Sequence, residues 1–508
     1  MEIASIAEPA GAAPGEKGLK GGAIGYLSNL VISTASVAPA YSLAATLGFV
    51  VAVNGVGLHA PAVMLVSFVP MLLIAAGYYY MNRADPDCGT SFTWVTRALG
   101  PHLGWLTGWV IVVADVVVMA TLAYIAGVYT FLLFGLDAAA TNLLDVSIAA
   151  AVWIAVMTWI CYVGIELSAR VQRVLLTIEI LTLAAFSIVA LVKVYGSPGP
   201  ASIHFDASWL NPFSISWGPL VDGVLLGVFI YWGWDSGVCV NEESENASTG
   251  PGKAAVMSTV LLLLIYVVVS VAAQGYAGEK FLVHHHNDVL GALGTKVFGS
   301  PLDKLLIITV LTSASASTQT TILPTARTTL SMARFGAIPR AFGRIHPRYL
   351  TPDVSTLTMG AASLVWTLFI INVSQNVLGD SITGLGFQIA FYYGLTGFAC
   401  AIFYRRELFK SARNFLLVGV APFLGGLMLT GIFVKALTFY KDPIENYSGG
   451  FVGVGTSVAV GVGLILLGVV VMIWANVVYP RFFKRRPEVV EPGILTGEVT
   501  GTASVLAD

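Results

Sequence analysis

The stretch FIYWGWDSGVCVNEE, residues 229–243, lies inside an apolar run that begins near Trp217. Within it, Gly233 and Gly237 flank the carboxylate of Asp235. Each glycine lowers helix stability by about 1 kcal/mol, and a carboxylate near the bilayer centre costs at least ~2.5 kcal/mol. Irregular backbone persists at membrane depth only where it is buried in protein or lines a wet cavity. The stretch therefore predicts a broken helix that holds a polar site in mid-membrane, an arrangement more typical of a transporter than of a soluble enzyme.

The composition is that of an integral membrane protein. Of the 508 residues, 56% are hydrophobic and only 11% are charged, and the mean hydropathy is +0.81. Soluble domains contain about 25% charged residues. A net charge of −2 says nothing about partners, and no basic block indicates nucleic acid as a partner. No cofactor is expected, and four cysteines follow no metal-ligand spacing: Cys88, Cys161, Cys239 and Cys400.

Windows of about 20 apolar residues mark membrane-spanning helices, and the chain contains twelve of them. An even number places both termini on the same side of the membrane. The predicted ranges are 23–53, 60–81, 102–134, 146–163, 168–195, 217–240, 253–277, 301–334, 354–373, 382–404, 413–440 and 451–480.

The distribution of basic residues indicates on which side of the membrane the termini lie. The loops and helix ends on the side of the termini carry 20 of the 26 lysines and arginines, including every arginine, and the other side carries 6. Positive charge accumulates on the cytoplasmic side of membrane proteins. We therefore expect a multi-pass protein of the plasma membrane with both termini in the cytoplasm. The first 22 residues lack the basic start and apolar core of a signal peptide, and these features fit a bacterial inner membrane.

A weak internal repeat divides the chain. Spans one to five, residues 23–195, begin with a helix interrupted at Ser33–Pro39, and spans six to ten, residues 217–404, begin with the helix interrupted at Gly233–Gly237. A repeat of five spans inverts its second copy, and paired interrupted helices indicate the binding site of an inverted-repeat transporter. The remaining predicted units are a cytoplasmic tail at 1–22, two further helices at 413–480 and a disordered cytoplasmic tail at 487–508.

Several motifs resemble the amino acid–polyamine–organocation superfamily of permeases. They are DPDCGTSFTW at 85–94, RALGP at 97–101, GWLTGW at 104–109, SARVQ at 168–172, the Gly233-Trp-Asp235 pattern with Glu242 and Glu243, and ARFGAIP at 333–339. Their order covers roughly residues 23–405. The resemblance implies an all-α membrane protein of twelve helices with a LeuT-type 5+5 inverted repeat and broken helices one and six. One departure is clear, because the family's Gly-Ser-Gly-like break in helix one reads Ser36-Val37-Ala38-Pro39 here.

The two breaks are the expected substrate site. Freed backbone N–H groups suit an anion and freed carbonyls suit an ammonium group, so the breaks together suit the zwitterionic head of an amino acid. Family members similarly use backbone at these positions, and the resemblance makes Phe229 the aromatic residue that closes over the substrate. The alternative is that the aromatic side chains only pack. The candidate residues are Ser36, Val37, Ala38, Phe229, Tyr231, Trp232 and Asp235.

Asp115 is the strongest indication of substrate class. It lies in the middle of a predicted span, in IVVADVVV at 111–118, and Met119 follows one turn later on the same helix. The resemblance places Asp115 on the face of the third helix that lies near a substrate's distal charge in the arginine/agmatine antiporter. A lone aspartate at this depth needs a partner, a proton or a wet cavity. We expect it to face a cationic amino acid or polyamine, and the alternative is a protonated aspartic acid bonded to a neighbouring helix.

Further polar groups in the spans are candidates for ion coupling. Glu179 stands where many proton-coupled relatives carry a lysine, and burial raises the pKa of a carboxyl group, so Glu179 or Asp235 is expected to carry the coupling proton. The alternative for Glu179 is a structural hydrogen bond to the hydroxyl-rich segment 312–321. Ser313 and Ser317 in that segment form a weak sodium-like candidate site, although small polar residues also simply allow close helix packing.

These features favour a secondary active transporter of amino acids, amines or polyamines, driven by protons as a symporter or else acting as an exchanger. No metal-spaced histidines, nucleophile elbow or P-loop supports an enzyme. A channel would need a repeated pore filter, and a sensor would normally add a regulatory domain. Glu242, Glu243 and Glu245 are expected to pair with Arg170 or Arg334 as an inner gate, or to be solvated. A homodimer is left open.

Overall fold

The computed structural model describes residues 17–373, 376–446, 448–451 and 453–487. The expected disordered tail at 487–508, apart from Pro487, and most of the tail at 1–22 therefore lie outside the described residues. The helices and strands are α1 (Tyr26–Ser36), α2 (Pro39–Ala52), α3 (Ala60–Ala84), α4 (Ser91–Leu99), α5 (Pro101–Leu133), α6 (Asp137–Thr141), α7 (Leu143–Val163), α8 (Ile165–Gly196), α9 (Trp217–Ile230), α10 (Ser236–Cys239), α11 (Gly250–His284), α12 (Val289–Phe298), α13 (Lys304–Arg334), α14 (Asp353–Val373), α15 (Val377–Phe403), α16 (Ala412–Asn414), α17 (Ala421–Tyr440), α18 (Thr456–Val478) and α19 (Pro480–Phe483), with an antiparallel pair β1 (Gly450–Phe451) and β2 (Val454–Gly455).

Eleven helical segments of the described chain are long and apolar enough to cross a membrane. They correspond to eleven of the twelve expected spans. The expected sixth span, 217–240, is the 14-residue helix α9 followed by turns and the four-residue helix α10, so the predicted interruption of this helix is present. Gly233 takes a φ of +116°, which is incompatible with continued helical hydrogen bonding. The sequence also gave no sign of α12, a short helix in the connection between α11 and α13.

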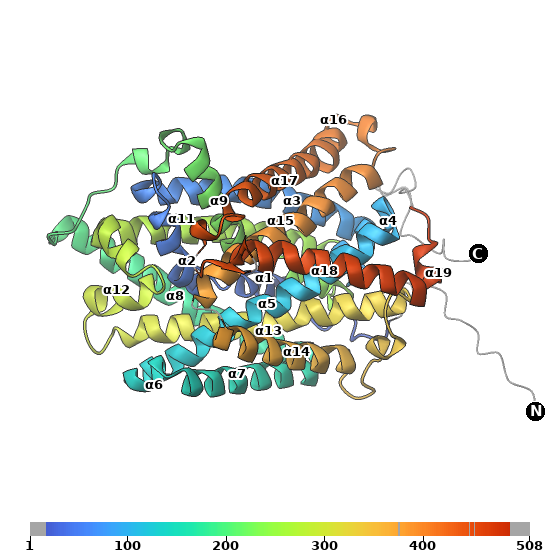
Figure 1. Ribbon diagram of the computed structural model, residues 1–508, viewed down its shortest axis with the longest axis horizontal. Coiled ribbons are helices and arrows are strands. Elements are labelled where there is room, and N and C mark those ends of the chain that lie inside the picture. Colours follow the sequence, from blue (N-terminus) through green and yellow to red (C-terminus); the bar gives the residue numbers. More distant parts are fainter. Residues whose placement is uncertain (1–16, 374–375, 447, 452, 488–508) are drawn as a thin grey trace, which may run out of the picture.

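The long helices run side by side along the molecule's long axis (Figure 1). We call the end that carries α4 and α19, at the right of the figure, the α4 face, and the end that carries α12, at the left, the α12 face. The outer side of α18 exposes Leu466, Val470, Ile473 and Val477. Such a continuous apolar surface suits contact with lipid chains rather than water.

The first helix break separates α1 from α2 at Val37 and Ala38, inside the interruption expected from the sequence. Ala38 takes a left-handed conformation with φ 50° and ψ 66°. Pro39 starts α2, where its missing N–H group does not cost a hydrogen bond. The chain therefore crosses the first span as two half-helices.

The second break lies against the first. The side-chain oxygens of Ser36 and Ser236 are 2.7 Å apart. A Cβ atom on Gly233 would come within 2.9 Å of the Ser36 carbonyl oxygen, and one on Gly237 within 2.1 Å of the Ser33 hydroxyl. Glycine at both positions is therefore required for the two backbones to approach so closely. Helices α5 and α13 pack along each other beside this contact, and α15 packs on α5 and α9.

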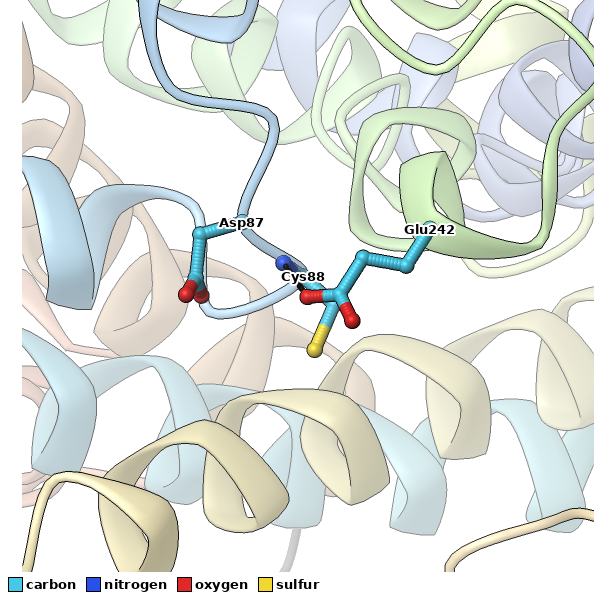
Figure 2. A group of neighbouring side chains, drawn as sticks. All are labelled: Asp87, Cys88 and Glu242. Carbon is cyan, nitrogen blue, oxygen red and sulfur yellow. Dashed lines mark hydrogen bonds between the residues drawn. The ribbon is translucent and has the colours of Figure 1, made fainter. Parts of the chain in front are cut away.

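A buried ion cluster lies close to α4, at the α4 face. Figure 2 shows Asp87 and Cys88 of the α3–α4 loop beside Glu242, which lies in a 3-10 turn (Asn241–Glu243) after α10. A ligand-type atom of each lies within 4.8 Å of the others. The Lys17 ammonium contacts all three, at 2.7 Å from Asp87 Oδ2, 2.7 Å from Glu242 Oε1 and 3.5 Å from Cys88 Sγ. The chain's own ammonium group thus supplies the cation for what we call the Lys17 cluster: Lys17, Asp87, Cys88 and Glu242.

A second buried pair lies next to the Lys17 cluster. Arg327 of α13 donates two hydrogen bonds of 2.8 Å to the carboxylate of Glu243, and Arg334 donates to the Lys17 carbonyl oxygen at 3.1 Å. The expectation that Arg170 or Arg334 pairs with the glutamates was wrong for Glu242 and Glu243. Arg327 is the partner of Glu243 because it lies about two helical turns before Arg334 on α13, at the depth where α10 ends.

Lys17 and Asp87 remain ionised at neutral pH. Burial alone would raise the pKa of Asp87, but the Lys17 ammonium and hydrogen bonds from Gly89 N–H and the Ser331 hydroxyl lower that pKa to about 2. Burial alone would lower the pKa of Lys17, and the carboxylates beside it raise that pKa well above its ordinary value. Both groups therefore keep their charges, which ties residue 17 to the ends of α3 and α10.

We expect Lys17→Met to destabilise the α4 face. The variant keeps the apolar stem but leaves Asp87 and Glu242 buried without their cation, and loss of one partner of a buried ion pair typically costs about 3–5 kcal/mol. The melting temperature in detergent should fall, and maleimide should label Cys88 faster in a background without the other three cysteines. The control is Lys20→Met, whose pair with Glu166 is about half exposed, at 47% and 51%, and is worth at most ~1 kcal/mol. Equal behaviour of the two variants would contradict this role.

The same cluster predicts an acid-sensitive stability. A carboxyl group whose pKa is lower in the folded state stabilises the fold above its unfolded pKa of ~3.9, and this contribution is lost as the pH falls from about 4 to about 2. The raised pKa of Lys17 acts only at the alkaline end, because its contribution is complete below pH ~10. We expect Asp87→Asn to flatten the decline of melting temperature between pH 4 and 2, and Asp137→Asn, at an exposed position of α6, to leave it unchanged. A decline of the same slope in Asp87→Asn would refute the assignment.

Candidate functional site

A cavity lies where the two helix breaks meet. Helices α5, α13 and α15 supply the walls opposite the breaks. Of the residues expected at the site, seven line this cavity: Ser36, Val37, Asp115, Phe229, Trp232, Asp235 and Ser317. Its lining combines carboxyl and hydroxyl groups with apolar and aromatic side chains, the mixture found in sites for small organic molecules.

Asp115 reaches the cavity from α5. It is 4% exposed, and the Thr325 hydroxyl of α13 donates a hydrogen bond to its carboxylate. The described ion pairs do not include Asp115. The hydrogen bond to a neighbouring helix that was the structural alternative is therefore present, and the same carboxylate also faces the cavity.

Asp235 lies on the second break, at the start of α10. Three phenol groups donate to its carboxylate, from Tyr393 at 2.8 Å, Tyr392 at 3.3 Å and Tyr78 at 3.4 Å. The Trp232 indole N–H in turn donates to the Tyr392 hydroxyl. The Asp235 carboxylate is thus surrounded by neutral hydrogen-bond donors. By contrast, Asp87, Glu242 and Glu243 at the α4 face contact a lysine or an arginine.

Glu179 lies behind the first break and does not line the cavity. Its Oε1 accepts a 2.7 Å hydrogen bond from Ala40 N–H of α2 and another of 2.7 Å from the Ser313 hydroxyl of α13. The bond to Ser313 is the structural contact that was one reading of this residue. Glu179 Oε2 is buried and has no hydrogen-bond partner in the described chain. Glu179 therefore connects α8 with the second half of the first span and with α13.

Ser313 and Ser317, the sodium-like candidates, bind groups of the chain itself. The Ser317 hydroxyl donates to the Ser36 carbonyl oxygen at 2.7 Å. The Ser313 oxygen also accepts from Tyr41 N–H at 3.1 Å. Both serines thereby join α13 to the first break by hydrogen bonds.

Three further candidates lie outside the cavity lining. Ala38 is the left-handed residue of the first break, and Tyr231 packs its ring against Phe68 and Tyr266. Met119 belongs to a separate apolar cluster with residues of α7 such as Ile154. Met119 therefore packs in the apolar core and does not line the cavity.

The cavity also contains residues that were not expected. Tyr392 of α15 and Tyr41 of α2 line it, and Tyr393 gives Asp235 its shortest hydrogen bond among the phenols. The tandem Tyr392-Tyr393 in the middle of a predicted span was an available signal, because buried phenol groups require acceptors. The pairing with Asp235 brings together residues 158 positions apart.

Comparison with known proteins agrees with this architecture. A family model described as "Amino acid permease" matches residues 24–483. Similar proteins include the branched-chain amino acid permease BcaP of Bacillus subtilis, 22% identical over 59% of this chain and 65% of that protein. The cationic amino acid transporter 3 of Arabidopsis thaliana is 24% identical over 61% of this chain and 52% of that protein. The low-affinity putrescine importer PlaP of Escherichia coli is 19% identical over 74% of this chain and 81% of that protein.

The alignment with the first of these relatives, BcaP, covers less than two thirds of that protein's own length. The family match is broader, because it extends from the start of the first span to α19 and includes both breaks and the cavity. It agrees with the superfamily resemblance of the sequence motifs and with a transporter rather than an enzyme. The chain belongs to the amino acid permease family.

Proposed function

We propose that the protein is a secondary active transporter that moves amino acids or related amines across the plasma membrane by alternating access. The observation that carries this proposal is the cavity between two interrupted helices, which holds the carboxylates of Asp115 and Asp235 at membrane depth. Interrupted helices that meet at mid-membrane are the usual site of substrate in inverted-repeat transporters. The relatives named as amino acid permeases, cationic amino acid transporters and a putrescine importer support the same class.

The α4 face is proposed to be cytoplasmic. All arginines lie in the loops and helix ends that we assigned to the cytoplasm, and Arg327 and Arg334 approach this face. In this orientation the Lys17 cluster and the Arg327–Glu243 pair close the inner end of the molecule. Opening toward the cytoplasm would then require these buried contacts to separate. The LeuT-type arrangement of two inverted five-helix repeats is part of this proposal.

Asp115 is proposed to bind a positive charge of the substrate. Its carboxylate faces the cavity, and the hydrogen bond from Thr325 leaves its charge uncompensated by any described cation. An ammonium group would supply that compensation and form a charge-assisted hydrogen bond. The alternative is a protonated Asp115 whose bond to Thr325 only joins α5 to α13.

Proton-coupled symport is the favoured energy source, with Glu179 as the proton-carrying group. Glu179 contacts both the start of α2 and Ser313 of α13, so a change in its charge alters the contact between the first break and α13. An exchanger would use the same cavity without this step. Asp235, which lines the cavity itself, is the second candidate for the proton.

We expect Asp115→Asn to weaken transport of cationic substrates. Hydrogen bonds to charged groups contribute about 1.5–3 kcal/mol, so KM should rise roughly 10- to 100-fold in proteoliposomes. Asp222→Asn, a buried acid of α9 outside the cavity lining, is the control. Thr325→Val should keep cation preference if Asp115 binds substrate. Unchanged uptake and preference in Asp115→Asn would remove Asp115 from the substrate site.

We expect Glu179→Gln to separate coupling from translocation. The amide oxygen still accepts from Ala40 N–H and Ser313, but the side chain no longer gains or loses a proton. Accumulation driven by an imposed pH gradient should be lost, while counterflow of labelled substrate against unlabelled substrate should persist. Glu279→Gln, at an exposed position near the end of α11, should behave like the wild type. Gradient-driven accumulation in Glu179→Gln, or a wild type insensitive to the gradient, would refute coupling at this residue.

A further inference from the structure

In the described structure, the backbone N–H groups of the first break already donate to carbonyl oxygens of the chain and are not free for a substrate carboxylate. Val37 N–H donates to the Thr34 carbonyl oxygen at 3.3 Å and Ala38 N–H to the Ala35 carbonyl oxygen at 3.1 Å. Pro39 has no N–H group. The residues that connect the two half-helices therefore keep their hydrogen bonds within the chain.

The start of α2 is also occupied. The positive end of a helix attracts an anion, and here that anion is the chain's own Glu179, which accepts from Ala40 N–H at 2.7 Å. The next N–H group, of Tyr41, donates to the Ser313 oxygen at 3.1 Å, and that of Ser42 donates to the Ala38 carbonyl oxygen at 2.8 Å. The place where a helix end would hold a substrate carboxylate is filled.

The second break holds its remaining N–H groups beside an acid. Tyr231, Trp232 and Ser236 donate their N–H groups to carbonyl oxygens of the same segment. In the part of the chain that the structure describes, the N–H groups of Gly233, Trp234 and Asp235 donate to no backbone carbonyl oxygen, and Gly233 and Asp235 line the cavity. A substrate carboxylate at these N–H groups would meet the carboxylate of Asp235, which lines the same space.

The charges of the cavity also disfavour a substrate carboxylate. Asp115 and Asp235 come from different helices of its wall, and the lining residues in the described chain include no lysine, arginine or histidine. A carboxylate in this space would meet two acids and no cation. Ammonium groups would meet the acids, and the rings of Phe229, Trp232 and Tyr392 would contact the methylene groups between them and provide cation–π faces.

From these donors and charges we propose that the cavity prefers aliphatic diamines to the corresponding amino acids. The two classes share a carbon chain and differ in the carboxylate, which the diamines lack. The proposal rests on the proposed transport function and specifies its substrate. Asp115 and Asp235 each bind one ammonium group of the diamine. The occupied first break excludes the α-carboxylate of lysine or ornithine.

The test uses pairs of compounds that differ only in the carboxylate. The purified full chain is reconstituted into liposomes, and uptake of labelled cadaverine is competed with cadaverine, lysine and lysinamide, and likewise labelled putrescine with putrescine and ornithine. We expect each diamine to compete at a concentration at least about tenfold below that of its amino acid, the effect of one charged hydrogen bond or more. Lysinamide is lysine without the negative charge, and it should compete at a concentration close to that of cadaverine.

The outcomes separate the two proposals. Lysine or ornithine competing as well as the matched diamine, and transported in labelled form, would overturn the diamine proposal while the transport function stands. Specific uptake of neither class would instead count against the proposed function. A lysinamide value equal to that of lysine would show that size rather than charge excludes the amino acid, and would also overturn the proposal.

A pair of serine variants tests the role of the first break directly. Ser313→Ala removes the acceptor of Tyr41 N–H and so frees one donor beside the cavity. We expect it to reduce the preference for cadaverine over lysine severalfold. Ser315→Ala, which removes a buried hydroxyl on the same helix that has no hydrogen-bond partner in the described chain, is the matched control. An unchanged cadaverine-to-lysine ratio in Ser313→Ala would contradict the assignment.

Discussion

The contact between the two interrupted helices is the constraint on which the rest of the structure depends. Each break exposes backbone polar groups at membrane depth, where unsatisfied groups are costly. The Ser36 carbonyl oxygen receives the Ser317 hydroxyl, and the Ser36 side chain bonds Ser236. Gly233 and Gly237 allow this approach because a side chain at either position would overlap the facing break. The breaks thus stabilise each other, and α13 supplies a hydroxyl donor to the first of them.

Charge is distributed differently at the two levels of the molecule. At the α4 face the buried acids Asp87, Glu242 and Glu243 contact cations, in the Lys17 cluster and in the pair of Arg327 with Glu243. In the cavity the acids meet only hydroxyl groups, from Thr325 at Asp115 and from three tyrosines at Asp235. Buried acids that carry no cation are unfavourable in isolation. The cavity is therefore suited to a positively charged molecule, while the paired charges at the α4 face hold the helices together.

Much of the architecture could be predicted from local sequence. Hydrophobic length located eleven of the long helices, and Pro39 together with Gly233 marked where the helices break, because both residues act on the backbone of their own segment. Asp115 stood out as an acid in an apolar run and does line the cavity. The partners of these residues were harder to predict, since Arg327 rather than Arg334 pairs with Glu243 and the choice depends on the relative depth of two helices.

The sequence by itself determined that this is a helical membrane protein with polar interruptions in two of its helices. Composition, hydrophobic length and backbone preference are properties of single segments and can be read from each segment alone. Only the tertiary structure decided what each polar group faces. It placed Glu179 at the start of α2, Tyr392 and Tyr393 around Asp235, and Met119 away from the cavity. These contacts join residues more than a hundred positions apart or depend on how a helix is rotated against its neighbours, and a single segment carries no information about either.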